Sequence, residues 1–128
     1  MTTLLLDTHV ALWVVTDSAR VGPGTRQRLL DPETVSLVSV ASVWEATIKT
    51  TAGRLQAPPE LWVEIERSGI AFVAIDRDDA IAAGTLPRHH GDPFDRMIVA
   101  QAIRRDAWLV TADSALSAYE VRTVRADE

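Results

Sequence analysis

The chain has 128 residues, 47% of them hydrophobic, which suits one domain around one packed core, and no apolar run reaches the roughly 18 residues that span a bilayer. The formal net charge is −5, which argues against a broad basic surface for nucleic acid. Cysteine is absent, which excludes disulfides, thiolate chemistry and cysteine-ligated zinc and fits a reducing, cytoplasmic setting.

Short apolar runs alternate with segments of helical spacing along the whole chain. The apolar and β-branched runs predict strands at residues 3–7, 34–40, 70–76 and 107–113, with 121–124 as a candidate edge strand. Helices are predicted at residues 8–17, 22–33, 39–55, 58–69, 77–87 and 92–106, with a helical turn at 114–120. This alternation predicts a single α/β domain over residues 1–128, with a mainly parallel central sheet flanked by helices.

Two aspartates directly follow apolar, strand-like runs. Asp7 ends the run TLLLD, and Asp113 ends AWLVTAD. Either carboxylate can cap the helix or turn that follows it by accepting a backbone N–H. For each residue alone, capping and a place in a functional site are equally open.

A second pair of aspartates lies in the stretch LPRHHGDPFDRMIVAQA. Asp92 precedes Pro93, and because proline favours the first helical position, Asp92 is predicted to be the N-cap of the helix. Asp95 would then be the third helical residue, where an acid suits the positive end of the helix dipole. Local structure alone therefore accounts for both residues.

Glu45 lies inside a predicted helix, where no capping role explains an acid. Lys49 follows four residues later, so an ion pair on a helix surface is the local explanation. Lys49 could instead orient Glu45 or contact a phosphate.

Taken together, these acids suggest more than local structure. The carboxyl ends of parallel strands form one rim of a sheet, where ligand sites gather. Asp7 and Asp113 end strands, and the helices that carry Glu45, Asp92 and Asp95 can start at the same rim. Like charges so close resist ionisation unless a cation neutralises them. Because Mg²⁺ and Mn²⁺ prefer oxygen ligands, an all-carboxylate site predicts one of these ions and suits phosphodiester hydrolysis by a metal-activated water.

Four stretches of the chain together resemble the four acidic motifs of PIN-domain proteins, in the same order. The stretches are LLLDTHVALW, SVASVWEATIKTTAGRL, LPRHHGDPFDRMIVAQA and LVTADSAL. The match covers nearly the whole chain and looks most like the VapC-type toxins of bacterial toxin–antitoxin pairs, in the subgroup with DPFDR in the third motif.

The resemblance implies a three-layer PIN-like fold and a Mg²⁺- or Mn²⁺-dependent endoribonuclease that is blocked by a VapB-like antitoxin. It assigns the catalytic and metal-binding acids to Asp7, Glu45, Asp95 and Asp113. Asp92 is an additional acid typical of the subgroup, interpreted as a cap first and a metal or water ligand second. The resemblance also implies a homodimer and a toxin–antitoxin hetero-oligomer.

Several other polar residues near the acids allow more than one interpretation. His89 and His90 are adjacent, and adjacent side chains in a loop rarely face one ion, so hydrogen bonding within the loop is favoured over metal ligation, with contact to an RNA phosphate as an alternative. Thr8 and Thr111 stand beside acids and could hydrogen-bond a carboxylate or cap a helix. Arg96 could reach RNA or pair with a carboxylate.

Three rival functions remain to be weighed. A phosphatase of the haloacid dehalogenase type needs Asp-x-Asp after the first strand, and DTH lacks the second acid. A response-regulator receiver needs a lysine late in the chain, and none follows Lys49. The third rival is a catalytically silent PIN-like module that binds RNA or protein, against which the intact set of acids argues.

Overall fold

Five strands form one sheet in which every neighbouring pair is parallel, in the order β3-β2-β1-β4-β5. The computed structural model describes all 128 residues. The strands are β1 (Thr2–Leu6), β2 (Thr34–Ser39), β3 (Ala71–Val73), β4 (Trp108–Thr111) and β5 (Thr123–Arg125). The helices are α1 (Thr8–Val15), α2 (Pro23–Leu30), α3 (Val40–Thr51), α4 (Leu61–Arg67), α5 (Arg77–Thr85), α6 (Pro93–Arg104) and the 3₁₀ helix η1 (Ser114–Ala118).

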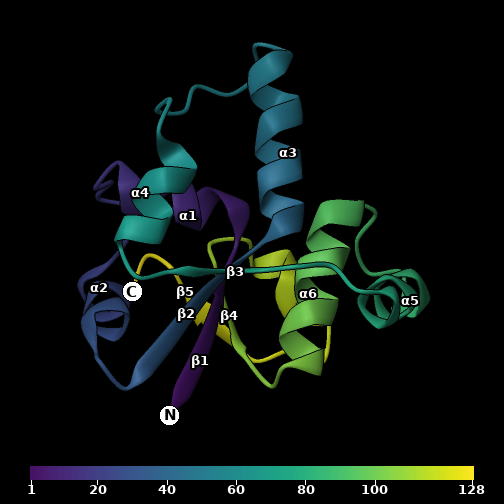
Figure 1. The fold of residues 1–128 in the computed structure, drawn as a ribbon. Coiled ribbons are helices and arrows are strands. Elements are labelled where there is room, and N and C mark those ends of the chain that lie inside the picture. Colours follow the sequence, from purple (N-terminus) through teal and green to yellow (C-terminus); the bar gives the residue numbers. More distant parts are fainter.

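Alternation along β1 divides the core into two layers. Leu4 and Leu6 face a cluster built with α1 and α4, whereas Leu5 faces the other side of the sheet and packs with α6 and η1. All three leucines are fully buried, as expected for a central strand that is covered on both faces. Figure 1 shows the resulting layers, with α1 and α4 on one side and α6, with α5 outside it, on the other.

The predicted fold class is confirmed, and the differences lie at element ends. The third strand is shorter than predicted, three residues instead of seven. Helix α4 begins at Leu61 rather than at the prolines, because Pro58 and Pro59 form the turn in which the Leu61 N–H donates to the Pro58 carbonyl. None of the helices combines the length and the apolar character that a membrane span requires.

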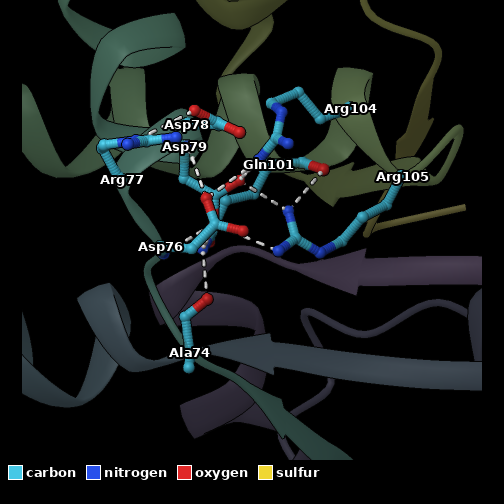
Figure 2. A network of polar contacts seen from close by, with 8 residues as sticks. All are labelled: Ala74, Asp76, Arg77, Asp78, Asp79, Gln101, Arg104 and Arg105. Carbon is cyan, nitrogen blue, oxygen red and sulfur yellow. Dashed lines mark hydrogen bonds and ion pairs between the residues drawn. The ribbon is translucent and has the colours of Figure 1, made fainter.

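A network of polar and charged side chains connects the start of α5 to the C-terminal part of α6 (Figure 2). Asp76 and Asp79 form a capping box at the start of α5, each side chain accepting the other's backbone N–H. The fully buried Asp79 carboxylate also accepts hydrogen bonds from Arg104, Arg105 and Gln101. Gln101 donates to the Ala74 carbonyl as well, so the network also fixes the chain that leads out of β3.

Burial and hydrogen bonding act in opposite directions on Asp79. Burial alone would raise its pKa, but the hydrogen bonds from Arg105, Gln101, the Asp76 backbone amide and Arg104 bring the pKa well below its ordinary value of 3.8. The spacing of Asp76 and Asp79 is the sequence signal from which the capping box could have been predicted. The arginine partners lie about 25 residues away, on a different helix, and needed the fold.

Candidate active site

The acids singled out in the sequence lie either just after a strand or in the first turns of a helix. Asp7 joins β1 to α1, and Asp113 lies between β4 and η1. Glu45 is in the second turn of α3, directly after β2, and Asp92 and Asp95 are in the first turn of α6. The carboxyl ends of the adjacent strands β2, β1 and β4 thus bring residues that are up to 106 positions apart to one edge of the sheet.

Asp7 occupies the N-cap position of α1, but its side chain makes no capping hydrogen bond. The Thr111 hydroxyl donates to Asp7 Oδ2 at 2.7 Å. Burial raises the pKa of Asp7 above its ordinary value, and the nearby charge of Glu45 adds to this, while the Thr111 hydrogen bond and His9 oppose it. Asp7 therefore lies at a cap position, but its carboxylate points toward Thr111 at the carboxyl end of β4 and not toward the backbone of α1.

Glu45 is paired with Lys49 as predicted, but not on a surface. Lys49 Nζ lies 2.8 Å from Glu45 Oε2. Only 4% of Glu45 is exposed, so the ion pair involves a buried carboxylate and does not lie on a solvent-exposed helix face. The local explanation was correct about the partner and wrong about the setting.

Asp95 carries the most perturbed carboxylate of the rim. Burial, followed by the charges of Asp7, Asp92 and Glu45, raises its pKa from 3.8 to about 7, with a smaller opposing effect from His90. Because the like charges of Asp7, Asp92 and Glu45 add to the effect of burial, these acids lie near enough to Asp95 to disfavour its ionised form. Asp95 is thus the electrostatic centre of the cluster.

Asp92 and Asp113 both act as caps. Asp92 Oδ1 accepts the backbone N–H groups of Phe94 and Asp95, at 2.8 and 3.2 Å. Asp113 Oδ1 accepts the N–H of Ala115 at 2.9 Å, at the start of η1. The predicted cap at Asp92 is therefore present, and the second carboxylate oxygen of each residue makes no hydrogen bond within the chain.

His90 belongs to the same cluster, which the sequence did not indicate. Its Nε2 lies 3.4 Å from Asp95 Oδ2 and 3.6 Å from Asp113 Oδ2. His89 instead packs edge-on against Tyr119, with ring centroids 5.2 Å apart. The adjacent histidines thus face different surroundings, as expected for neighbours in a loop, and only His90 reaches the acids.

Of the remaining polar candidates, Thr8 and Arg96 connect parts of the fold, and Thr111 contacts an acid of the candidate site. Thr8 donates to the Ser42 hydroxyl at 2.8 Å and so joins α1 to α3 instead of contacting an acid. Arg96 forms no ion pair with a carboxylate. Its guanidinium instead donates to the backbone carbonyls of Ala83, Leu86 and Pro87. Thr111 is the one threonine that contacts a rim carboxylate, and its hydroxyl also accepts the Asp113 N–H.

The donor set of the rim fits a hard divalent cation. It offers carboxylate oxygens, no thiolate, and more negative charge than its cationic neighbours compensate, as the raised pKa of Asp95 indicates. One oxygen each of Asp95 and Asp113 and one nitrogen of His90 lie within 4.8 Å of one another. These residues thus offer the ligand chemistry that Mg²⁺ and Mn²⁺ prefer.

Known proteins resemble this chain over nearly its full length. Ribonuclease VapC22 of Mycobacterium tuberculosis (strain ATCC 25618 / H37Rv) is 33% identical over 122 residues, which is 93% of each chain. VapBC2 from Rickettsia felis, bound to a DNA fragment from its promoter, superposes with a TM-score of 0.72 at 13% identity, covering 96% of this chain and 98% of the other. DNA-bound VapBC from Salmonella typhimurium gives a TM-score of 0.71 at 20% identity, covering 97% and 98%.

The structural likenesses establish the fold, and the sequence comparisons establish the family. Residues 4–121 match the family described as PIN domain. This match includes all five acids of the rim, from Asp7 to Asp113. The chain belongs to the PIN-domain family.

Proposed function

We propose that this chain, as a single PIN domain over residues 1–128, is a metal-dependent endoribonuclease and the toxin of a toxin–antitoxin pair. The observation that carries the proposal is the cluster of Asp7, Glu45 and Asp95, three shielded carboxylates, of which Asp95 has its pKa raised to about 7 by burial and by the charges of its acidic neighbours. A structural role does not require acids to be held this way. The relation to a protein named ribonuclease supports RNA as the substrate.

In this proposal Asp7, Glu45, Asp95 and Asp113 hold Mg²⁺ or Mn²⁺. Bound there, such an ion lowers the pKa of water and offsets charge that develops on a phosphodiester. Asp92 holds the first turn of α6, so that Asp95 projects from a fixed position. Thr111 fixes the Asp7 carboxylate and Lys49 fixes that of Glu45, so both oxygens are oriented before a ligand arrives.

No side chain at the rim is an evident nucleophile, so hydrolysis by water without a covalent intermediate is proposed. The alternative is a PIN-like module that binds RNA or protein without cleaving it. The two functions differ in whether RNA is cut when metal is present, not in whether RNA is bound.

The direct test is cleavage of a labelled RNA by the purified chain in Mg²⁺ or Mn²⁺ and in EDTA. We expect cleavage with metal, none in EDTA, and loss of cleavage in Asp95→Asn. Asp78→Asn is the matched control, because Asp78 is a solvent-exposed aspartate of α5 outside the rim. RNA that stays intact with metal present would favour the binding module, and full activity in Asp95→Asn would refute the site assignment.

The partners are proposed on the same basis: a VapB-like antitoxin that blocks the rim, a homodimer, and a cytoplasmic location. Solved structures with this fold include toxin–antitoxin complexes. Expression of the chain with the product of a short neighbouring reading frame should yield a complex of defined mass in light scattering. RNA cleavage by that complex should be lower than by the free chain, and unchanged cleavage would argue against an antitoxin role for that product.

A further inference from the structure

The loop between α5 and α6 places basic side chains beside an acidic cluster. Residues 86–92 include Arg88, His89 and His90, in a chain whose net charge is −5. A hollow of about 510 Å³ opens at this loop and is lined by these three residues and Arg96, with no apolar side chain except proline. His90 thus lines the hollow and also reaches Asp95 and Asp113.

The hydrogen bonding of His90 determines which ring nitrogen carries the proton. His90 Nδ1 accepts the backbone N–H of Asp92 at 3.1 Å. A backbone amide can only donate, so Nδ1 must present its lone pair. A neutral imidazole has a single N–H, which therefore lies on Nε2.

This tautomer makes His90 a donor toward the rim and not a metal ligand. A cation would need the lone pair of Nε2, which the proton occupies. His90 Nε2 lies 3.4 Å from Asp95 Oδ2 and 3.6 Å from Asp113 Oδ2, and it forms a hydrogen bond with neither. His90 therefore offers an N–H at the site without a close partner inside the protein.

The Asp92 amide holds the ring through Nδ1, and further hydrogen bonds hold the backbone of the loop around it. The Tyr119 hydroxyl donates to the His90 carbonyl at 3.3 Å. The Arg96 guanidinium binds the carbonyls of Ala83, Leu86 and Pro87, which fixes the end of α5 and the start of the loop. A donor that is oriented in advance interacts with developing negative charge at little further entropic cost.

The two arginines of the hollow keep an uncompensated positive charge. Arg96 hydrogen-bonds carbonyls and a tyrosine hydroxyl, which carry no charge, and it forms no ion pair. Arg88 is exposed and makes neither a hydrogen bond nor an ion pair. A cationic hollow next to clustered carboxylates matches a polyanion of which one phosphate lies at the acids and the next at the loop.

We propose that His90 donates its Nε2–H to a non-bridging oxygen of the RNA phosphate at the carboxylate cluster, and that the adjoining hollow receives the neighbouring phosphate beside Arg88. The inference deepens the proposed nuclease function and depends on it. In this inference, residues 86–92 form one side of the substrate site, and their positive charge is opposite to the charge of the acids.

Two substitutions of His90 separate a donor from a ligand. His90→Gln can place an amide N–H near the position of Nε2, whereas His90→Asn retains only a group near Nδ1. We expect His90→Asn to lower kcat/KM for RNA cleavage by roughly 10- to 100-fold, and His90→Gln to recover much of the loss. Thermal unfolding of both variants checks that they fold.

Mn²⁺ affinity, measured by titration with electron paramagnetic resonance in the absence of RNA, gives a readout other than activity. We expect both variants to bind Mn²⁺ within about twofold of the native chain, because His90 is not a ligand. A loss of tenfold or more in His90→Asn would assign His90 to the metal and overturn the proposal. Cleavage by a folded His90→Asn at the native rate would overturn it as well.

Arg88→Ala tests the hollow, with Arg28→Ala of α2 as the control that removes the same charge elsewhere. Arg28 is exposed, forms no ion pair and lines neither the rim nor the hollow. We expect Arg88→Ala to raise KM several-fold and to weaken the salt dependence of RNA binding, and Arg28→Ala to leave both unchanged. If the two variants have equal effects, Arg88 acts only through the net charge of the protein, and its assignment to the substrate site is overturned.

The outcomes also distinguish this inference from the proposed function. If the native chain cleaves no RNA in Mg²⁺ or Mn²⁺, the nuclease proposal fails and this one fails with it. If the native chain cleaves RNA and the loop variants do so equally well, only the loop assignment fails. If the variants escape inhibition by an antitoxin but cleave normally, the loop contacts protein instead of RNA.

Discussion

Asp79 and Asp95 are both largely shielded from water, yet their surroundings have opposite charge. Asp79 accepts hydrogen bonds from two arginines and a glutamine, and its pKa is lowered. Asp95 faces Asp7, Asp92 and Glu45, and its pKa is raised to about 7. Two aspartates of one small domain thus differ in whether burial is matched by compensating donors.

The difference separates a structural carboxylate from the one that we propose to be functional. The Asp79 network joins α5, α6 and the end of β3, and the donors to both oxygens of the Asp79 carboxylate come from within the chain (Figure 2). Burial and the like charges of the neighbouring acids instead disfavour the ionised form of Asp95, and the chain provides no arginine that compensates it. Strongly perturbed acids that the fold itself does not compensate are typical of functional sites.

The largest expected effect is on activity, from Asp95→Asn. Removing this carboxylate should lower RNA cleavage by roughly 100- to 1000-fold, because the proposed metal site loses a ligand and its negative charge. The same change should raise the melting temperature of the metal-free chain, because a neutral amide removes the repulsion from Asp7 and Glu45. Cleavage assays and calorimetry in EDTA measure the two effects. An active variant, or one that melts lower in EDTA, would contradict the comparison.

Asp79→Ala should have the opposite profile. It leaves Gln101 and two arginines without their shared acceptor, which we expect to cost about 2–3 kcal/mol of unfolding free energy and to lower Tm by roughly 10 °C. Cleavage per folded molecule should change little at a temperature well below the transition. A variant as stable as the native chain would show that the network contributes no net stability.

The two aspartates should also give the metal-free chain opposite pH dependences. With the pKa of Asp95 raised to about 7, the folded chain binds more protons than the unfolded chain between pH 3.8 and about 7, so its contribution to stability falls as pH rises through this window. The lowered pKa of Asp79 contributes stability that is present above pH 3.8 and is lost as pH falls below it.

Melting curves in EDTA across this range check both signs. Asp95→Asn should flatten the decline toward neutral pH, and Asp79→Asn should flatten the loss in acid. Saturating Mn²⁺ should reverse the decline near pH 7 in the native chain, because the ion binds the folded state only. A decline that persists unchanged in Asp95→Asn would show that another group is responsible.

The smallest expected effect concerns Asp92, which has a structural role as the cap of α6 and also lies among the mutually repelling acids. Asp92→Asn keeps a side-chain oxygen for the N–H groups of Phe94 and Asp95, so stability should change little, whereas Asp92→Ala should cost about 1 kcal/mol. Cleavage should fall less in Asp92→Asn than in Asp95→Asn. Equal losses of cleavage would identify Asp92 as a metal ligand on a par with Asp95.

The strand and helix order was predictable because it depends on local patterns. The apolar runs in TLLLD and AWLVTAD are too continuous for exposed segments, and their alternation with capped helices leaves a parallel sheet as the consistent arrangement. Asp92 before Pro93 indicated the start of α6 to the residue. The order of the strands across the sheet and the short β3 depend on packing between elements and were not predicted.

The sequence by itself determined which acids are available, that Asp7 and Asp113 follow strands and that Asp92 starts a helix, since all of these are properties of neighbouring residues. Only the tertiary structure decided how each acid is used. It turns Asp7 away from its capping position toward Thr111, buries the Glu45–Lys49 pair, and brings His90 to Asp95 and Asp113. The physical reason is that burial and charge at a carboxylate depend on groups from distant segments, which are brought together only when the sheet aligns its strand ends.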